Sequence, residues 1–375
     1  MSRSLALSVG LLAPVLASAA PSTLDQVVGA TLRRNYDALH GCYRLALAQD
    51  RSRAGTLFVR VTLGAADTVT HARLDRDELK HAPTAACVLK WMRGWTLSGA
   101  AAAGAGPGTE VVVPIIYRAA PKQQSVWEAD VEARALGAAG QVQLLLTRQN
   151  VGASLASLAL LTLRSHLALP GAPQKLLYVL SGRGVLAAGT SRLPLGPGTA
   201  LALRASLPVT LSPTRGELRC LVLFLPAGGE QALLPTKEVF PEIPAKGPAG
   251  RLLRPERIDR TTPLLLAEGK LKVTPLLQRK TQGHSRFYLG LLEAAAPSSV
   301  PEHSHFAEAE VLFVLSGKGE MGIEGTLTPV GPGQAIYIPA GASHSVRVES
   351  GPLKVVQVYV PGGPEQRFFQ KADAR

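Results

Sequence analysis

The chain has 375 residues, of which 46% are hydrophobic and 18% are charged. This composition is that of a globular protein with sizeable buried cores, and the length favours two or three domains. The formal net charge is +13, but the basic residues are dispersed and no aromatic residues interleave with them, which argues against nucleic-acid binding. The 37 glycines and 28 prolines are scattered along the chain, as expected for many short strands joined by turns.

The first residues have the pattern of a targeting segment. Arg3 supplies a basic start, residues 5–16 are apolar, and residues 17–19 are the small residues of a cleavage site. The apolar stretch is too short to span a bilayer comfortably, and no later segment has a long uninterrupted apolar run. We predict a signal peptide over 1–19, no transmembrane helix in the mature chain, and a periplasmic or secreted protein. An uncleaved anchor is the alternative.

Three cysteines are present, Cys42, Cys87 and Cys220. An oxidising compartment permits a disulfide. Cys42 and Cys87 both fall in the first hundred residues, so we predict that they pair and that Cys220 is a buried thiol.

Residues 24–120 are expected to form a small α+β domain. The predicted elements in chain order are a helix over 24–49, strands over 56–63 and 69–75, a helix from Pro83 to Arg93, and a strand over 110–118. Pro114 predicts an edge position for the last strand, because proline cannot donate a ladder hydrogen bond.

This segment resembles the small C-terminal domain of myxobacterial gliding-motility proteins, which is itself similar to TonB-type energy transducers. The resemblance rests on Gly41-Cys42-Tyr43, the strand after Gly55, Cys87, Trp91, Trp95 and the sequence VVVPIIY at 111–117. It agrees with the predicted disulfide and implies a protein-contact module with an envelope protein as its partner. The residues around Trp95 depart from the family pattern, so a transducer role is not implied.

An internal repeat follows. Residues 175–203 and 310–338 both contain a strand, a Ser-Gly-basic-Gly turn, a second strand, a Gly-Pro-Gly turn and a third strand. Such self-similarity indicates duplicated structure, and the many short strands favour barrels or sandwiches. We therefore predict a mostly β fold with barrels at 121–227 and 263–375 and a linker over 228–262.

The second copy carries a cluster of polar residues beside an apolar strand. His303 and His305 are two residues apart and point to one side of an extended chain. Glu310 shares a strand face with Leu312 and Val314, where the core should lie, and a buried unpaired carboxylate is costly. A divalent cation would accept the imidazole lone pairs and offset the carboxylate charge.

A further histidine, His344, follows a Pro-Ala-Gly turn at 339–341. Together these residues resemble the two cupin motifs, although Pro297 and Val348 replace a glycine and an asparagine of the family pattern. Residues 121–375 thus resemble a bicupin. The resemblance implies one divalent transition metal (Mn, Fe, Ni, Zn, Cu or Co) held by His303, His305, Glu310 and His344, with open positions for a ligand.

The first copy lacks these ligands. When Ser181 is aligned with Ser316, the four ligand positions are occupied by Ala168, Pro170, Lys175 and Val209. A lysine would repel a cation, and His166 stands alone, so we predict a metal-free barrel.

The ligand pocket is expected to be lined by His284, Arg286, Leu312, Val314 and Val346. The first hypothesis is an exported protein that binds a small oxygen-rich ligand at its metal. The alternatives are a metal-dependent dioxygenase, decarboxylase or isomerase, and a structural envelope protein. The family resemblance also favours a homo-oligomer.

Overall fold

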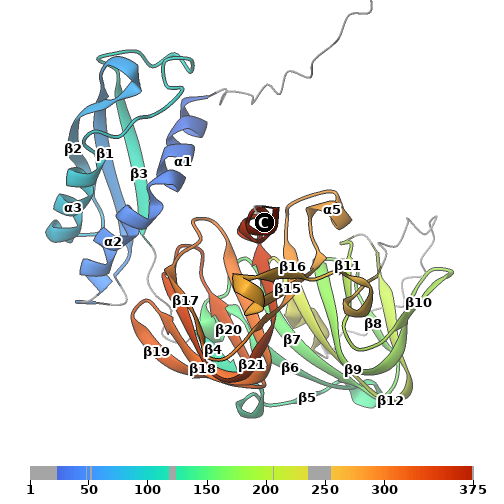
Figure 1. Ribbon diagram of the computed structural model, residues 1–375. Coiled ribbons are helices and arrows are strands. Elements are labelled where there is room, and N and C mark those ends of the chain that lie inside the picture. The colour runs from blue at the N-terminus through green and yellow to red at the C-terminus, as the bar shows by residue number, and fades with distance from the viewer. Residues whose placement is uncertain are drawn as a thin grey trace, which may run out of the picture. The chain divides into compact units, whose positions relative to one another are not determined.

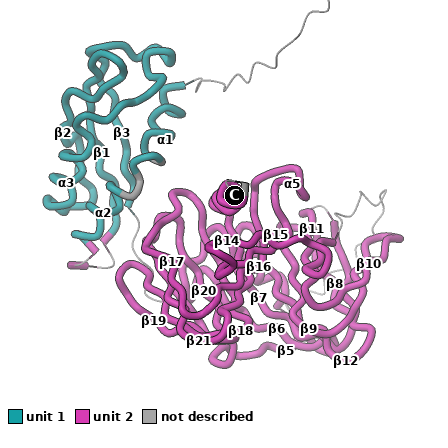
Figure 2. The backbone as a smooth tube through the Cα atoms, in the orientation of Figure 1, with its two compact units in different colours: residues 1–46, 54–118 teal, residues 47–53, 119–375 magenta. Residues whose placement is uncertain are grey.

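The computed structural model describes residues 23–47, 49–50, 53–117, 124–205, 207–234 and 255–373. The predicted signal peptide and residues 235–254 of the predicted linker lie outside these ranges. The chain divides into two compact units, residues 1–46 with 54–118 and residues 47–53 with 119–375 (Figure 2). Among the described helices, none has the length and apolar character needed to cross a membrane.

The described part of unit 1 contains the α-helices α1, α2 and α3 and a three-stranded antiparallel sheet of order β2-β1-β3. Its elements are α1 (Leu24–Arg34), α2 (Tyr36–Leu47), β1 (Gly55–Leu63), β2 (Val69–Asp77), α3 (Ala82–Met92) and β3 (Glu110–Tyr117). β3 lies at an edge, as Pro114 predicts. One helix was expected over 24–49, but α1 and α2 are separate. The break falls at Asn35, where the carbonyl of Thr31 accepts from both the side chain (2.9 Å) and the backbone amide (3.2 Å) of Asn35.

A disulfide joins α2 to α3. Cys42 and Cys87 form a bond of 2.03 Å, which confirms the predicted pair, and Cys220 is a buried free thiol. The bond lies in a packed region: the Thr84 hydroxyl donates to the Cys42 carbonyl (3.1 Å), and the ring of Tyr43 stacks on that of Tyr117 with centroids 4.4 Å apart. The disulfide therefore ties two helices that are far apart in sequence to one side of the unit.

Unit 2 consists mainly of two nine-stranded antiparallel sheets (Figure 1). The first has the order β13-β11-β9-β12-β7-β6-β5, with β10 paired to β9 and β8 to β12. Its strands are β5 (Arg134–Ala135), β6 (Gly140–Leu146), β7 (Ser157–Leu163), β8 (Leu167–Leu169), β9 (Gln174–Ala188), β10 (Ser191–Leu195), β11 (Thr199–Leu203), β12 (Val209–Leu225) and β13 (Glu256–Arg257).

The second sheet has the order β14-β15-β16-β21-β18-β20-β4, with β17 paired to β21 and β19 to β18. Its strands are β4 (Ser125–Trp127), β14 (Leu264–Leu266), β15 (Leu271–Leu277), β16 (Tyr288–Ala294), β17 (Ser298–His303), β18 (Ala309–Ile323), β19 (Thr326–Val330), β20 (Gln334–Ile338) and β21 (His344–Val360). Unit 2 also has the helices α4 (Arg148–Val151), α5 (Arg279–Gln282) and α6 (Gln366–Asp373). The repeat is visible in the strands: β9 and β18 each have 15 residues, and β12 and β21 each have 17.

Two short strands cross the expected domain borders. β4, which precedes the first sheet in sequence, pairs with β20 of the second sheet, with Val126 opposite Ala335. β13, inside the predicted linker 228–262, pairs with β11 of the first sheet, with Glu256 opposite Ala200. Each sheet thus takes an edge strand from beyond the range predicted for it. Sequence alternation can reveal a strand but not its partner, and strands this short carry little alternation.

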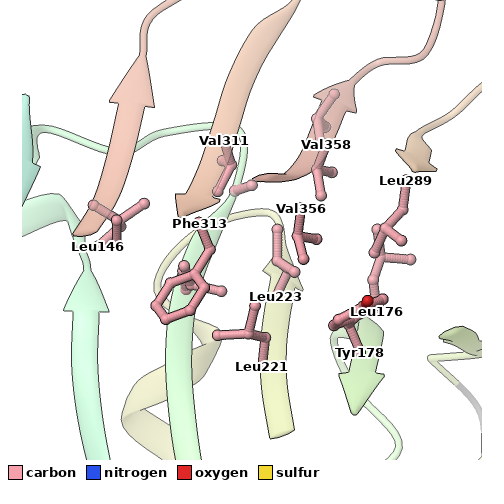
Figure 3. Packing of buried hydrophobic residues seen from close by; sticks show 14 of the residues in the cluster. Leu146, Leu176, Tyr178, Leu221, Leu223, Leu289, Val311, Phe313, Val356 and Val358 are labelled. Atoms are coloured by element: carbon pink, nitrogen blue, oxygen red, sulfur yellow. The ribbon is translucent and has the colours of Figure 1, made fainter. Parts of the chain in front are cut away.

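The two sheets share a hydrophobic core. Figure 3 shows side chains of the first sheet packed against side chains of the second, namely Leu146, Leu176, Tyr178, Leu221 and Leu223 against Leu289, Val311, Phe313, Val356 and Val358. Each fully buried leucine, valine or phenylalanine contributes about 1.5–3 kcal/mol. The sheets therefore form one packed body.

The register of β18 decides which side chains enter the second barrel. Val311 and Phe313 belong to the core between the sheets, whereas Leu312 and Val314 belong to a separate interior cluster. Because strand side chains alternate between faces, Glu310 lies on the same face as Leu312, inside the barrel.

The disulfide generates a test in unit 1. Replacing Cys42 and Cys87 together by alanine should lower the stability of this unit by about 2–5 kcal/mol, because the reduced chain gains conformational freedom when unfolded. Amide hydrogen exchange of residues 55–117 in the full chain measures the change. Cys220→Ala, in unit 2, is the control and should leave this exchange unchanged. Unaltered protection in the double variant would contradict the prediction.

Candidate metal centre

The three predicted histidine ligands and Glu310 are brought together by β17, β18 and β21. His303 ends β17, Glu310 is the second residue of β18 and His344 begins β21. Backbone pairing sets His303 opposite His344 and Glu310 opposite Tyr359. His305 follows β17, and its carbonyl accepts from the amide of Gly341 (2.6 Å) in the turn before His344.

The three histidine side chains cluster together, and Glu310 contacts two of them. Ligand atoms of the three histidines lie within 4.8 Å of one another. Glu310 Oε2 is 3.1 Å from Nε2 of His344 and 3.5 Å from Nε2 of His305. Glu310, His305 and His344 are buried, and His303 is half-buried. Residues that are up to 41 positions apart, from His303 to His344, therefore meet in one small volume.

Hydrogen bonds to backbone carbonyls determine which ring nitrogen of His303 and of His344 keeps a lone pair. Nδ1 of His303 lies 2.8 Å from the carbonyl of Pro301, and Nδ1 of His344 lies 3.0 Å from that of Ala342. A carbonyl can only accept, so both Nδ1 atoms carry the proton and both Nε2 atoms keep a lone pair. Such outer contacts orient metal-ligating histidines in proteins.

One polar atom of the cluster has no hydrogen-bond partner. His344 Nε2 is buried and makes no hydrogen bond to any described residue. Its lone pair faces Glu310 Oε2, which is also an acceptor, so the neutral ring and the carboxylate cannot satisfy each other. A cation between them would accept both lone pairs. The donor set of three imidazoles and one carboxylate thus fits a divalent transition metal.

The electrostatic environment of the cluster favours the protonation states in which these side chains can bind a metal. Burial, followed by the neighbouring His344 imidazole, lowers the pKa of His303 to about 4, so the ring is neutral at pH 7. Burial alone would raise the pKa of Glu310, whereas an N–H donor or a positive charge on the side of His305 and His344 lowers that pKa below its usual value. A neutral imidazole and an ionised carboxylate are the states that bind metals.

Two buried polar residues beside Glu310 were missed by sequence reasoning. Nε2 of Gln357 donates to Glu310 Oε1 (2.7 Å) and to the hydroxyl oxygen of Tyr359 (2.9 Å). Burial and then the Glu310 carboxylate raise the pKa of Tyr359 well above its usual value, so its hydroxyl stays protonated. The available signal was the single glutamine in the apolar run VVQVYV at 355–360, which pairs across β18.

An arginine on the C-terminal helix also reaches the cluster. Nη2 of Arg367, on α6, donates to His305 Nε2 (3.2 Å), because a guanidinium has no acceptor. The third imidazole therefore also keeps a lone pair on Nε2, which lies 3.5 Å from Glu310 Oε2. No local motif marks Arg367, so its place at this cluster could not be predicted from the sequence.

The residues predicted to line a pocket fall in two places. Leu312, Val314 and Val346 pack in the interior cluster of the second barrel. His284 and the exposed Arg286 lie between α5 and β16, and the His284 ring packs edge-on against Phe287, a member of the core between the sheets. The structure brings the apolar three together and places the polar pair by the junction of the barrels.

The first sheet repeats this arrangement with inverted charge. Lys175 occupies the position of Glu310 and stands opposite Phe224, as Glu310 stands opposite Tyr359. Its side chain is buried, and Nζ donates to the carbonyls of Pro170, Gly171 (2.9 Å) and Pro173 (2.8 Å). Burial lowers the pKa of Lys175 to about 8, so the ammonium remains mostly charged at neutral pH.

Comparison with known proteins gives a partial family assignment. Residues 291–359, which contain the histidines and Glu310, match the cupin domain family. Quercetin 2,3-dioxygenase of Bacillus subtilis is 30% identical over 109 residues, which cover 29% of this chain and 32% of that enzyme. The chain thus spans about a third of that relative. An uncharacterised protein of Methanocaldococcus jannaschii is 27% identical over 105 residues, covering 26% of this chain and 78% of that protein.

Solved structures agree on the fold. A variant of Bacillus subtilis oxalate decarboxylase has a TM-score of 0.53 at 14% identity, covering 64% of this chain and 78% of that one. The Lactobacillus farciminis oxalate decarboxylase formate complex has a TM-score of 0.52 at 11% identity, covering 64% of this chain and 87% of that one. Another solved structure of the Bacillus enzyme is described as having Mn(II) centres. The fold is therefore mostly β, with two cupin-like jelly-roll barrels after a small α+β region. The likeness of residues 24–120 to gliding-motility and TonB-type domains stays a prediction.

The Lys175 contacts generate a test. Lys175→Met keeps the length and apolar stem of the side chain but removes the donor for three carbonyls, so stability should fall by about 1–3 kcal/mol. Urea unfolding measures the change. Lys318→Met, which alters an exposed lysine on β18, is the control and should stay within about 0.5 kcal/mol of the wild type. Equal stability of the two variants would contradict a structural role for this ammonium.

Proposed function

We propose that the second barrel holds one divalent transition metal through His303, His305, Glu310 and His344, and binds a small oxygen-rich ligand there. The observation that carries this proposal is the cluster of three histidine side chains, two of which contact the buried Glu310 carboxylate, with His344 Nε2 lacking a hydrogen-bond partner. Mn, Fe, Co, Ni, Cu and Zn all suit this donor set.

The chain's own groups would prepare the site for such a ligand. The metal, when bound, would supply a Lewis acid that polarises a ligand oxygen. Gln357 holds one oxygen of Glu310, which leaves Oε2 turned towards His305 and His344. The apolar residues of the barrel interior, among them Leu312 and Val314, would exclude bulk water. These contacts support a rigid, partly dry binding site.

A metal-dependent enzyme is the second candidate, favoured by Tyr359. Its hydroxyl accepts from Gln357 Nε2, so its own proton is not used in that bond and could pass to a bound ligand. The partial match to a quercetin dioxygenase and the likeness in fold to oxalate decarboxylases support oxygen or decarboxylation chemistry. A structural envelope role would need neither the inward lone pairs nor this hydroxyl.

We also propose that the protein is exported and that unit 1 serves as a contact module for an envelope protein. The basic and apolar start of the chain supports export, and so does the disulfide between Cys42 and Cys87, because such bonds persist in oxidising compartments. Association of the barrels into a homo-oligomer remains part of this proposal.

Metal content tests the proposed site. Protein purified from its own compartment should contain one metal ion per chain by elemental analysis. His344→Ala should lose the metal, because it removes one of three imidazoles. His166→Ala, which alters an exposed histidine of the first barrel, is the control and should keep it. A content near two per chain, or no loss in His344→Ala, would contradict the single site.

Turnover distinguishes the two candidates. Metal-loaded protein is incubated in air with pools of carboxylates, phenols and sugars, and compound loss is followed by mass spectrometry. An enzyme should consume a compound that persists with His344→Ala, and Tyr359→Phe should slow its loss by about a hundredfold while keeping the metal. If no pool changes but one compound binds, the binding function stands alone.

A further inference from the structure

We propose that Arg367 makes the second barrel selective for an anionic ligand, a small carboxylate or related oxyanion that would bridge the metal and the guanidinium. This inference rests on the proposed metal site and names the ligand class for it. It concerns a residue outside the stretch 291–359 that matches the cupin domain.

The position of Arg367 is set by packing. The neighbouring Phe368 is buried in a cluster with Leu266, Val273, Tyr288 and Tyr359, which fastens α6 to the sheet. Just before the helix, the buried carboxylate of Glu365 accepts from the amide of Gly363 (2.6 Å). The helix therefore starts at a fixed point, and Arg367 is held where it reaches His305.

The guanidinium of Arg367 lacks a counter-ion. It is half-buried and donates to His305 Nε2, yet among the described residues no carboxylate lies within ion-pair distance of it. An arginine keeps its charge at all physiological pH values. A partly buried cation without an anionic partner is costly, so the site as it stands would favour a negative group.

Metal binding would increase the preference of the site for a negative group. The lone pair of His305 Nε2 that accepts from Arg367 is the same lone pair that the metal would take, so the guanidinium would lose this acceptor. A dication, one carboxylate from Glu310 and one guanidinium would then leave an excess of positive charge in a buried space. An oxyanion next to the metal would reduce this charge and could accept two parallel hydrogen bonds from the arginine fork.

In the described part of the first barrel, the position equivalent to Arg367 carries no cationic group. The repeat places Ala232 of the 3₁₀ segment Gly229–Leu233 where the second barrel has Arg367. The same alignment places Lys175 at Glu310. Arginine and the metal ligands thus occur together in one copy and are both missing from the other, as expected if they act on one ligand.

Two matched probes test the proposal by binding rather than by activity. Glycolate and glycolamide offer the same pair of oxygens to a metal, but only glycolate is charged. Cobalt(II)-loaded protein is titrated with each, and the visible spectrum of the cobalt reports the dissociation constant. The wild type should bind glycolate at least about tenfold more tightly than glycolamide, the scale of one charge-assisted hydrogen bond.

The variants separate recognition from folding and from general charge. Arg367→Gln should weaken glycolate binding by about tenfold to a hundredfold and leave glycolamide within about twofold. Arg367→Lys should restore part of the preference, because a point charge remains without the fork. Lys371→Gln removes a charge from an exposed position on the same helix and should behave as the wild type.

Each remaining outcome decides the matter. Arg367→Gln should also bind cobalt at least as tightly as the wild type, since it removes a positive charge and a competitor for His305. A preference for glycolate that persists in a cobalt-loaded Arg367→Gln would overturn the anion selectivity alone. Loss of cobalt from this variant, at unchanged circular dichroism, would show a structural role and also overturn it. Failure of the wild type to take up cobalt would overturn the proposed function itself.

Discussion

The burial of a single carboxylate, that of Glu310, is the constraint on which the second barrel depends. The side chain is only 4% exposed and lies on the strand face that otherwise carries Leu312 and Val314. Moving an ionised carboxylate from water into such surroundings costs several kcal/mol unless it is paired and hydrogen-bonded. Gln357 satisfies one oxygen, and the other is left facing imidazoles that can offer it no proton without becoming cations. A positive charge at the centre would resolve the arrangement, and the proposed metal site rests on that argument.

The first barrel resolves the same position in the opposite way. Lys175 carries a positive charge on its own side chain into the barrel, and the loop carbonyls of Pro170, Gly171 and Pro173 supply the negative ends of dipoles around it. In the second barrel the position of Pro170 is held by His305, which contacts Glu310. The same two positions of the repeat therefore interact in both copies. The first copy carries its own cation at this position, and the second copy would receive one from the proposed metal ion.

Sequence reasoning was most successful for polar residues on strands, where the two-residue alternation of side chains shows which face each residue occupies. Alternation placed His303 and His305 on one side of their strand and Glu310 on the core face of the next, and the resemblance to the cupin motifs joined them with His344 in one site. The order of short strands was out of reach, since β4 and β13 have only three and two residues and their partners lie in the other half of unit 2. Arg367 was missed because a helix that follows the last strand can pack in several ways, and which residue faces the barrel depends on where Phe368 is buried.

The comparison of the two copies shows where the divergence lies. Both end in the same kind of turn, in which a buried glutamate, Glu230 or Glu365, accepts from a glycine amide two residues earlier. Both copies thus keep this turn, but the residues near the site differ. Gln357 corresponds to Val222, Tyr359 to Phe224 and Arg367 to Ala232. Gln357 donates to Glu310 and Arg367 donates to His305, and the first copy lacks both of these contacts. A barrel needed merely for packing would gain nothing from Gln357 and Tyr359, because buried polar groups stabilise a core less than valine and phenylalanine do. The polar set of the second barrel is therefore best explained by the ligand it would hold.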